Sequence, residues 1–443
     1  MKKKCSPLSV AAGKGVQKAC RLLKRGHSLP GMIVEKMDKG FLASALGQLP
    51  LGTMIVCGTN GKTTTARLIS QALKDLGLKV VTNDSGANFT RGIISSLLPH
   101  ITPSGKLPCD IGIFELDEAW APVFCRQFPP SYALILNCSR DQLDRYGERD
   151  SVESMLAKVA SSATRGLILN GGDERVRRFS SLARGAKVSF YDFDPAVASL
   201  FPRDEDLICM RQGVSSKAPD AEAAVVLKGA FGDRASFEVA GKEFSFEMGV
   251  EGSFNFLNAA AAIAGILNIE KCCPEIGKEG RFKSIDLSPK SVAEAVSKVK
   301  PAFGRGEEFR IRGSKVKMVL VKNPVGFSSA LRAIPLQDRD VMVALNDESA
   351  DGRDVSWIYD VDYSNLSKIK DVTGERAFDM ALCLEYNGKD VRKADLDMSK
   401  SLSDFLEGPH DKVIFSSYTS MLSLRKILLE MDKSKGGDLY AAD

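Results

Sequence analysis

The chain reads VCGTNGKTTT from residue 56 to residue 65, and this stretch decides the fold of the first half of the protein. An apolar segment at 51–56 precedes it, and an apolar pattern with helical spacing begins at Ala66. A strand, a glycine turn and a helix in this order form a phosphate-binding loop, because backbone N–H groups and the positive end of the helix face the same anion. We therefore predict an ATP site; a glycine turn capped by threonines is the purely structural alternative.

The residues of this loop have different roles in holding a nucleotide. Lys62 can reach the outer phosphates, and the Thr63 hydroxyl can ligate Mg²⁺. The usual spacing has a glycine five residues before Gly61, where this chain has Val56, so the loop is typical of one branch of such ATPases. We expect replacement of Lys62 to abolish ATP turnover and to leave the fold intact. The predicted nucleotide contacts in the loop are Thr59, Asn60, Gly61, Lys62, Thr63 and Thr64.

Length and composition indicate a soluble protein of two or three domains, with 443 residues, 44% hydrophobic and 26% charged. No apolar run approaches the roughly 20 residues of a membrane-spanning helix, so we expect a cytoplasmic protein. The net charge of +5 is too small to indicate nucleic-acid binding. Ten cysteines without a Cys-x-x-Cys pair indicate free thiols in a reducing compartment. Three histidines leave little material for a histidine metal site or a Cys-His nucleophile pair.

The N-terminal segment, residues 1–47, is basic and helical in pattern. Its first 36 residues hold nine Lys or Arg and one acid, Glu35. Val16, Leu22 and Leu23 are interleaved with these charges, so the segment could rest as a basic helix on the cytoplasmic face of a membrane. A solvated helix packed on the ATPase is the plainer alternative.

The remaining chain predicts two α/β units. Short apolar strands alternate with helices from about residue 48, which is typical of a doubly wound, mostly parallel sheet covered on both faces. We expect an ATP-binding domain at 48–303, with a small antiparallel insertion or edge sheet at about 196–250, and a smaller Rossmann-like α/β domain at 304–443. The predicted strands are 52–57, 79–82, 110–116, 132–137 and 166–170 in the first unit, and about 316–321, 340–345, 380–384 and 412–415 in the second.

Two further polar positions fit an ATP site. Glu115 closes an apolar strand, and side chains at such strand ends meet the ligand crevice of an open α/β sheet, so Glu115 could hold Mg²⁺ together with Thr63. Asp117 and Glu118 follow it and could instead only cap the next helix. Asn255 and Asn258 lie three apart on one predicted helix, where they could contact adenine or form a helix cap.

These features together resemble the Mur ligase family, and within it the MurT branch, the Mur-ligase-like subunits of lipid II isoglutaminyl synthases. The resemblance covers about residues 30–420, and the last of the segments that carry it is the most specific. These segments are 85–88, 140–148, 322–326 and 351–360. Only 57 residues precede Gly58, too few for the nucleotide-sugar-binding domain of the peptide-adding Mur ligases.

The resemblance implies a reaction and a set of site residues. ATP would activate the D-glutamate α-carboxylate of the peptidoglycan stem peptide on lipid II, and ammonia from a GatD-type glutaminase, in a heterodimer, would convert it to D-isoglutamine. Phosphate contact is implied for Lys62, Thr63 and Arg305, and an adenine-side contact for Asn258. Mg²⁺ is implied at Glu115.

Asp354 would reach the active site of the partner. We expect it to orient a glutaminase histidine, with Trp357 and Tyr359 as interface aromatics; a helix cap by Asp351 or Asp354 is the structural alternative.

The chain departs from the branch in two respects. Members commonly carry a four-cysteine zinc ribbon in the middle domain, but residues 196–250 contain only Cys209, so we predict no zinc. The carbamylated lysine of some Mur ligases has no convincing match, and Lys158 fits an ordinary helix face. Two other functions stay open: a glutamate-adding ligase like folylpolyglutamate synthetase, and a nucleotide-binding regulatory subunit that does not ligate.

Overall fold

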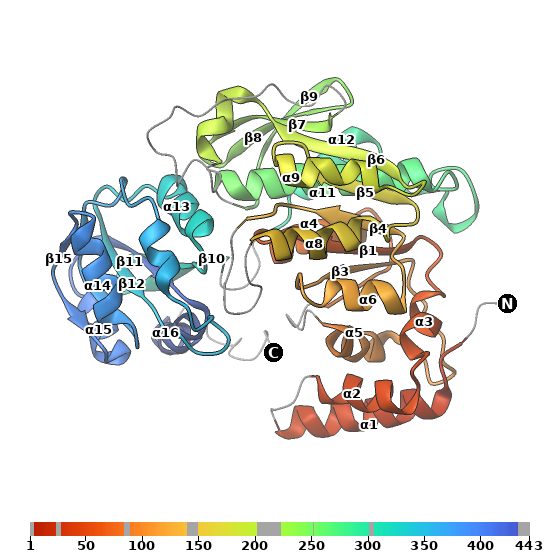
Figure 1. Cartoon of the computed structure of the whole chain (residues 1–443), viewed down its shortest axis with the longest axis horizontal. Helices are drawn as coiled ribbons and strands as arrows, with labels where there is room; N and C mark the ends of the chain where they lie inside the picture. Colours follow the sequence, from red (N-terminus) through yellow and green to blue (C-terminus); the bar gives the residue numbers. More distant parts are fainter. Residues whose placement is uncertain are drawn as a thin grey trace.

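The computed structural model describes residues 4–23, 28–83, 89–139, 149–201, 223–250, 252–300 and 305–432. Figure 1 shows two α/β units, a large one that contains the N-terminal two thirds of the chain and a smaller one formed by the remainder. Each unit has its own central sheet, and each sheet has an apolar core on both of its faces.

The large unit is built on a nine-stranded sheet with the order β2-β3-β1-β4-β5-β6-β7-β8-β9. Neighbours from β2 to β7 run parallel, and β8 is antiparallel to both of its neighbours, β7 and β9. The strands are β1 (Gly52–Cys57), β2 (Val80–Thr82), β3 (Ile111–Glu115), β4 (Tyr132–Ile135), β5 (Gly166–Asn170), β6 (Lys187–Phe193), β7 (Ala223–Phe231), β8 (Arg234–Val239) and β9 (Lys242–Glu247).

Strand β1 shows why this sheet is covered on both faces. All of its residues are buried, and successive side chains of a strand point to opposite faces. Met54 and Val56 accordingly belong to one apolar cluster, and Ile55 and Cys57 to the other. Helices α4 (Lys62–Asp75), α11 (Ser253–Cys272) and α12 (Pro289–Ser297) pack on the first face; α5 (Thr90–Leu97), α6 (Ala121–Gln127) and α8 (Arg149–Ala160) lie on the other.

The N-terminal segment forms a layer outside this second set of helices. Helix α1 (Pro7–Leu23) packs on α2 (Leu29–Met37), α2 packs on α5, and the short α3 (Phe41–Leu46) leads to β1. The approach of α1 is close: a Cβ atom on Gly13 would lie 2.6 Å from Val34 Cγ2 and 2.9 Å from Leu98 Cδ1. Glycine is therefore required where α1 meets the rest of the unit.

The smaller unit contains a six-stranded sheet with the order β10-β11-β17-β12-β14-β16, in which only the β10–β11 pair is antiparallel. A separate parallel pair joins β13 and β15. The strands are β10 (Arg305–Ile311), β11 (Ser314–Leu320), β12 (Arg339–Ala344), β13 (Lys368–Ile369), β14 (Asp371–Thr373), β15 (Asp390–Val391), β16 (Ala394–Asp395) and β17 (Asp411–Ser416). The helices are α13 (Pro324–Ala333), α14 (Ala377–Tyr386), α15 (Met398–Phe405) and α16 (Tyr418–Met431).

The fold class is confirmed, and one predicted strand is wrong. The segment 380–384 lies inside helix α14. Its run of five apolar residues fits a buried strand and a buried helix equally well when periodicity is considered alone. Burial separates the two: Ala377, Met380 and Leu384 are buried, whereas Phe378 and Leu382 are exposed, which is a helical spacing.

Within the described residues, no helix combines the length and the apolar character that a bilayer crossing requires. The predicted domain boundary near residue 303 falls outside the described residues.

Candidate phosphate site and partner-facing surface

The phosphate loop, residues 58–63, joins the end of β1 to the start of α4. Strand β1 lies between β3 and β4, where the order of strands reverses, and ligand crevices of open α/β sheets form at such a point. Gly58 has a φ of 127° and Gly61 a φ of 88°, values that favour glycine. A Cβ atom on Gly61 would also lie 2.3 Å from Asn258 Oδ1. The loop therefore requires glycine both for its turn and for its contact with α11.

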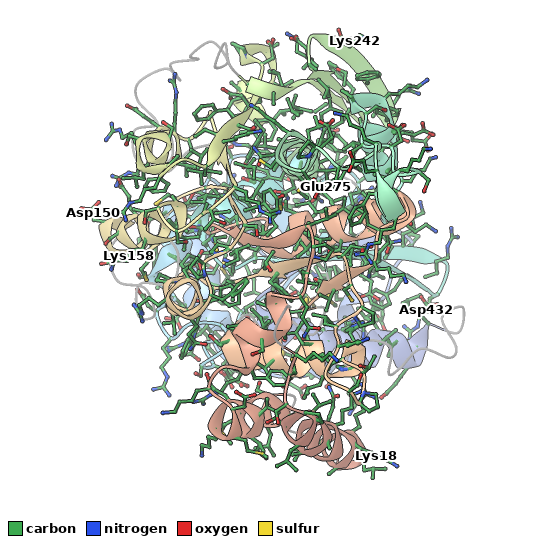
Figure 2. The ribbon with its side chains drawn as sticks, turned by 90° about the vertical axis from the view of Figure 1, so that its right-hand side faces the viewer. Lys18, Asp150, Lys158, Lys242, Glu275 and Asp432 are labelled. Atoms are coloured by element: carbon green, nitrogen blue, oxygen red, sulfur yellow. The ribbon has the colours of Figure 1, made fainter. Side chains whose placement is uncertain are left out.

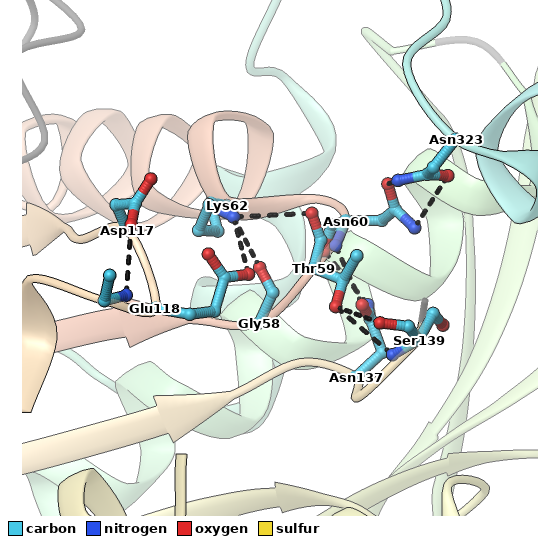
Figure 3. Close-up of polar contacts among 10 residues, drawn as sticks. Gly58, Thr59, Asn60, Lys62, Asp117, Glu118, Asn137, Ser139 and Asn323 are labelled. Atoms are coloured by element: carbon cyan, nitrogen blue, oxygen red, sulfur yellow. Dashed lines mark hydrogen bonds and ion pairs between the residues drawn. The ribbon is translucent and has the colours of Figure 1, made fainter. Parts of the chain in front are cut away.

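Two residues just after β4 fix the conformation of the loop through hydrogen bonds. The Asn60 N–H donates to Asn137 Oδ1 at 2.8 Å, and Asn137 Nδ2 donates to the Asn60 carbonyl at 3.0 Å. The Thr59 hydroxyl donates to the Ser139 carbonyl at 3.0 Å and accepts from the Ser139 N–H. Figure 3 shows Asn137 and Ser139 beneath the turn. The sequence did not single out these two residues, because only the pairing of β1 with β4 brings them to the loop.

Lys62 is held in place by buried partners. Its ammonium donates to the Gly58 carbonyl at 2.7 Å and to Glu118 Oε1 at 3.0 Å, as Figure 3 shows. The side chain of Glu118 is 1% exposed and that of Lys62 12%. The premise that Lys62 makes no buried contact is therefore wrong, and we expect its replacement to lower stability, because it would leave a carboxylate buried without this cation. Neither residue caps the next helix, since α6 has no side-chain cap among the described residues; Asp117 accepts from the Ala119 N–H at 3.0 Å in the turn before it.

Glu115 lies where a metal ligand could serve the loop. It is the last residue of β3, it is paired in register with Val56 of β1, and it is 7% exposed. Asn83, after β2, fixes its backbone: Asn83 Nδ2 donates to the Glu115 carbonyl at 2.9 Å, and the Glu115 N–H donates to Asn83 Oδ1 at 3.0 Å. Within the described part of the chain, no hydrogen-bond partner reaches the buried Glu115 Oε2. A buried carboxylate oxygen of this kind fits Mg²⁺, which prefers oxygen ligands.

The other predicted nucleotide contacts are Thr63, Thr64, Asn258 and Arg305, and the structure describes the side chains of the first three. Thr63 and Thr64 are in the first turn of α4, where Thr64 is buried. Asn258 lies against Gly61, and its Nδ2 donates to Asn255 Oδ1 at 3.4 Å. Arg305 begins β10, but its side chain, like segments 85–88 and 140–148, lies outside the described residues.

The smaller unit reaches the loop through Asn323. Asn323 Nδ2 donates to Asn60 Oδ1 at 2.9 Å, and Asn60 Nδ2 donates back to Asn323 Oδ1 at 3.4 Å. The same Asn323 oxygen caps α13 by accepting from the Gly326 N–H at 2.8 Å. Nearby, Arg332 of α13 donates to the Ser199 carbonyl of the large unit at 3.3 Å. The segment 322–326 therefore links the smaller unit to the phosphate loop.

Asp354 lies on the smaller unit and is partly exposed. Its Oδ1 accepts from the Ser356 N–H at 2.8 Å, at the start of the short helix η5 (Ser356–Asp360). Asp351 is buried, and its Oδ1 accepts from the Thr419 N–H in the first turn of α16; neither Asp351 nor Asp354 is the N-cap residue of a described helix. The expectation for Trp357 is wrong, because its ring is buried and lies 6.4 Å from that of Phe327.

Beside η5, helix α14 presents large apolar side chains to solvent. Phe378, Leu382 and Tyr386 are spaced by four residues and are 61%, 49% and 78% exposed; Tyr359 of η5 is 51% exposed. Partial burial, with Cys383, Asp379 and Tyr386 nearby, raises the pKa of Tyr359. The two elements therefore form one surface, here called the α14 face, which consists of Tyr359, Phe378, Leu382 and Tyr386.

The described cysteines are free thiols. Burial raises the pKa of Cys5 and of Cys125 to about 11. In the described ranges, no group of three or more His, Cys, Asp or Glu is arranged to hold a metal ion. Cys209 lies outside those ranges, so the absence of zinc stays a prediction. Lys158 is exposed on α8, as expected of an ordinary helix face.

Comparison with known proteins finds a family match for each of the two units. The description "Mur ligase middle domain" matches residues 56–266, and "MurT ligase C-terminal" matches residues 320–421. The subunit MurT of lipid II isoglutaminyl synthase (glutamine-hydrolyzing) from Streptococcus pneumoniae is 28% identical over 95% of this chain and 96% of its own length. The corresponding subunit of Staphylococcus aureus is 28% identical over 93% and 95%.

Solved structures agree on the fold. MurF from Acinetobacter baumannii superposes with a TM-score of 0.65 at 14% identity, covering 91% of this chain and 80% of that one. MurF ligase from Thermotoga maritima, in complex with ADP, gives 0.62 at 16% identity, with coverages of 90% and 83%.

Proposed function

Because the chain belongs to the Mur ligase family and is of the MurT type, we propose that it is the synthetase subunit of a lipid II isoglutaminyl synthase. It uses ATP to amidate the α-carboxylate of D-glutamate in the peptidoglycan stem peptide, giving D-isoglutamine, with ammonia from a glutaminase subunit. The observation that carries this proposal is the similarity over the smaller unit, since a phosphate loop is common to all Mur ligases whereas this unit matches MurT.

The proposed reaction has two steps. A carboxylate oxygen of the substrate attacks the γ-phosphorus of ATP, the bond to the β,γ-bridging oxygen breaks, and ADP leaves. Ammonia then attacks the acyl carbon, the bond from that carbon to the phosphate oxygen breaks, phosphate leaves, and the nitrogen releases a proton to solvent. Activation is required because a carboxylate does not react with ammonia at neutral pH, and the protein contributes positioning and charge neutralisation.

The phosphate loop supports the first step. Its N–H groups and the start of α4 favour an anion, and Lys62 adds a positive charge whose position is set by the Gly58 carbonyl and Glu118. Glu118 would act as a positioning residue for Lys62. Asn258 and Arg305 stay proposed contacts, to the adenine side and to phosphate respectively.

The residues at the loop also fit a magnesium ion. Glu115 and the Thr63 hydroxyl would hold Mg²⁺, with Glu115 Oε2 as the oxygen that other described groups leave available. When bound, Mg²⁺ neutralises phosphate oxygens that gain charge during transfer. Asn83 would keep Glu115 at the end of β3 through the two hydrogen bonds to its backbone.

The second step draws on the partner, a GatD-type glutaminase in a heterodimer. We place its docking surface on the α14 face, because a cluster of exposed aromatic and aliphatic side chains is typical of protein interfaces. Asp354 adjoins this face through η5 and would orient a histidine of the glutaminase. Its bond to the Ser356 N–H holds the carboxylate at the start of that helix.

The proposal extends to the site of action and to the domains. A lipid-linked substrate would be met at the cytoplasmic face of the membrane. We assign ATP binding to a middle domain at 48–303 and contact with the glutaminase to a domain at 304–443.

An assay on lipid II tests the proposed function. The chain is co-purified with the glutaminase and incubated with lipid II, ATP and glutamine; conversion of the acid to the amide changes the product mass by about one dalton, and fragmentation locates the change. ATP-dependent amidation of D-glutamate is the expected result. Addition of an amino acid without a partner would instead indicate a folylpolyglutamate synthetase-like ligase, and nucleotide binding without any product a regulatory subunit.

A further inference from the structure

One stripe along the solvent-facing side of α1 is apolar. Leu8 and Leu22, at its two ends, are 72% and 78% exposed. Ala11, Gly15 and Ala19 lie between them at helical spacing and are exposed as well. These five residues, here called the α1 face, form a stripe about 20 Å long.

The opposite side of the same helix is firmly anchored. Val10 and Gly13 are buried, with Gly13 against Val34 and Leu98, and Cys5, just before the helix, is buried as well. The Cys5 N–H donates to the Gly105 carbonyl at 3.1 Å. The protein therefore fixes the orientation of α1, and the α1 face does not result from a loosely attached helix.

The charges along the α1 face are of one sign. Lys14 and Lys18, together with Arg21, follow one flank of the stripe, and α1 contains no acidic residue. Figure 2 shows Lys18 at the outer surface of the N-terminal layer, at the opposite end of the protein from Lys242. Glu35 of α2 is engaged by Arg91, whose Nε lies 2.8 Å from Glu35 Oε2.

We propose that the α1 face docks on an anionic lipid bilayer. A helix with an exposed apolar stripe and a basic flank lies in the plane of a membrane surface, with its apolar side chains among the acyl chains and its cations at the lipid phosphates. The contact is peripheral. It is independent of the proposed function, although it would keep the ligase where a lipid-linked substrate is presented.

The charge pattern favours a bilayer over other occupants. A nucleic acid would be bound through phosphates by the basic flank alone, and the exposed leucines would have no role. A protein partner is commonly bound through aromatic side chains, as the α14 face offers, whereas the α1 face has none. A bilayer rich in anionic lipid complements both the leucines and the uniform positive charge.

Vesicle binding tests the proposal with the full-length chain and without substrate. The protein is sedimented with vesicles of phosphatidylcholine alone and with vesicles that contain phosphatidylglycerol, at low and high salt. K14Q/K18Q/R21Q should lower the partition coefficient on anionic vesicles about 100-fold, since each cation near such a surface contributes about fivefold. L8S/L22S should lower it at least about tenfold.

A matched control has the same loss of charge elsewhere. Lys158, Lys242 and Lys278 are exposed on other elements, so K158Q/K242Q/K278Q should bind anionic vesicles as the unmodified chain does. Leu396 is 53% exposed in the smaller unit, and L396S provides the apolar control. The proposal is supported if the unmodified chain and the controls bind anionic vesicles equally well and the two α1 variants bind them less.

Three results would overturn it. These are equal losses in the α1 variants and the controls, equal binding to neutral and anionic vesicles, and binding of a DNA or RNA duplex, but not of vesicles, that depends on Lys14, Lys18 and Arg21. A failure of the lipid II assay would leave the vesicle result unaffected, so the two proposals can fail separately.

Discussion

The phosphate loop and the Asp354 surface hold their charged groups in different surroundings. Lys62 and Glu118 form an ion pair that is almost entirely buried, among hydrogen bonds from three strands of the large sheet. Asp354 is partly exposed, has a local backbone bond to Ser356, and adjoins the apolar α14 face. The first site is therefore shaped before any ligand arrives, whereas the second would depend on another protein to exclude water. Variants at the two sites should differ in whether stability or partner-dependent activity is lost.

The largest effect is expected at the exposed site. Asp354→Asn should lower glutamine-dependent amidation by up to about 10⁴-fold, the cost of losing an orienting carboxylate in a catalytic triad. Binding of ATP and of the glutaminase should be unchanged, and free ammonium should restore part of the product. Rates with glutamine and with ammonium are compared, with Asp360→Asn, at the last residue of η5, as the control. Full glutamine-dependent activity in Asp354→Asn would remove the residue from the shared site.

At the enclosed site, Lys62→Ala should act on turnover and stability together. Loss of the phosphate charge should reduce ATP turnover at least about 100-fold. The buried Glu118 would lose its cation, at a cost of about 3 kcal/mol in unfolding free energy. Denaturant unfolding measures this cost, and the double variant Lys62→Ala/Glu118→Ala should recover most of the stability but none of the turnover. A single variant as stable as the unmodified chain would show that the pair does not exist in solution.

Substitutions on the α14 face should weaken only the association with the glutaminase. Phe378→Ser/Tyr386→Ser should weaken binding of the glutaminase about 30-fold or more, because exposed aromatic side chains commonly dominate interface energies. Titration calorimetry with the glutaminase measures the affinity. Phe231→Ser is the matched control, since Phe231 is 80% exposed on the large unit. If both variants bind the partner equally well, the docking surface lies elsewhere.

A smaller effect is expected from Glu115→Gln. The amide keeps the size of the side chain and removes the anionic oxygen, so the Mg²⁺ concentration for half-maximal ATP turnover should rise about tenfold or more. Titration with MgCl₂ at saturating ATP measures this shift. An unchanged requirement would make Glu115 structural and Asp117 the next residue to replace.

The smallest effect is expected from treatment with a zinc chelator, because we predict that the protein holds no structural zinc. Structural zinc needs about four Cys or His ligands, and residues 196–250 contain one cysteine and no histidine. Elemental analysis should find less than stoichiometric zinc, and dialysis against a chelator should leave the melting temperature unchanged. One zinc per chain retained through dialysis would mean that distant cysteines come together outside the described residues.

The sequence predicted the local parts of the site and missed the parts that depend on topology. Gly58, Gly61 and Lys62 are adjacent, and the strand before them and the helix after them carry their own patterns. Asn137 and Glu118 meet the loop only because β4 and β3 flank β1 in the sheet, an order that no local pattern contains. Asn323 lies 263 residues beyond Asn60 and reaches it only through the packing of the two units.

The same limit explains the errors in the smaller unit. Between Met380 and Leu384 every residue is apolar, so the spacing could not distinguish a strand from a helix. Trp357 was predicted at an interface because aromatic residues are common there, but a single sequence does not say which of two nearby rings faces inward. The structure places Trp357 in the core and Tyr359 at the surface.

The hydrogen-bonded amides of Asn60 and Asn323 connect the phosphate loop to the smaller unit. The conformation of the loop therefore depends on how the two units are arranged. A nucleotide that displaces Asn60 would change the free energy of this pair, and a partner that displaces Asn323 would change it as well. Coupling of this kind is reciprocal: if ATP favours one arrangement of the units, a protein that binds the same arrangement raises the affinity for ATP by the same factor. Glutaminase docking and nucleotide binding would then be linked through two asparagine side chains, without direct contact between the two ligands.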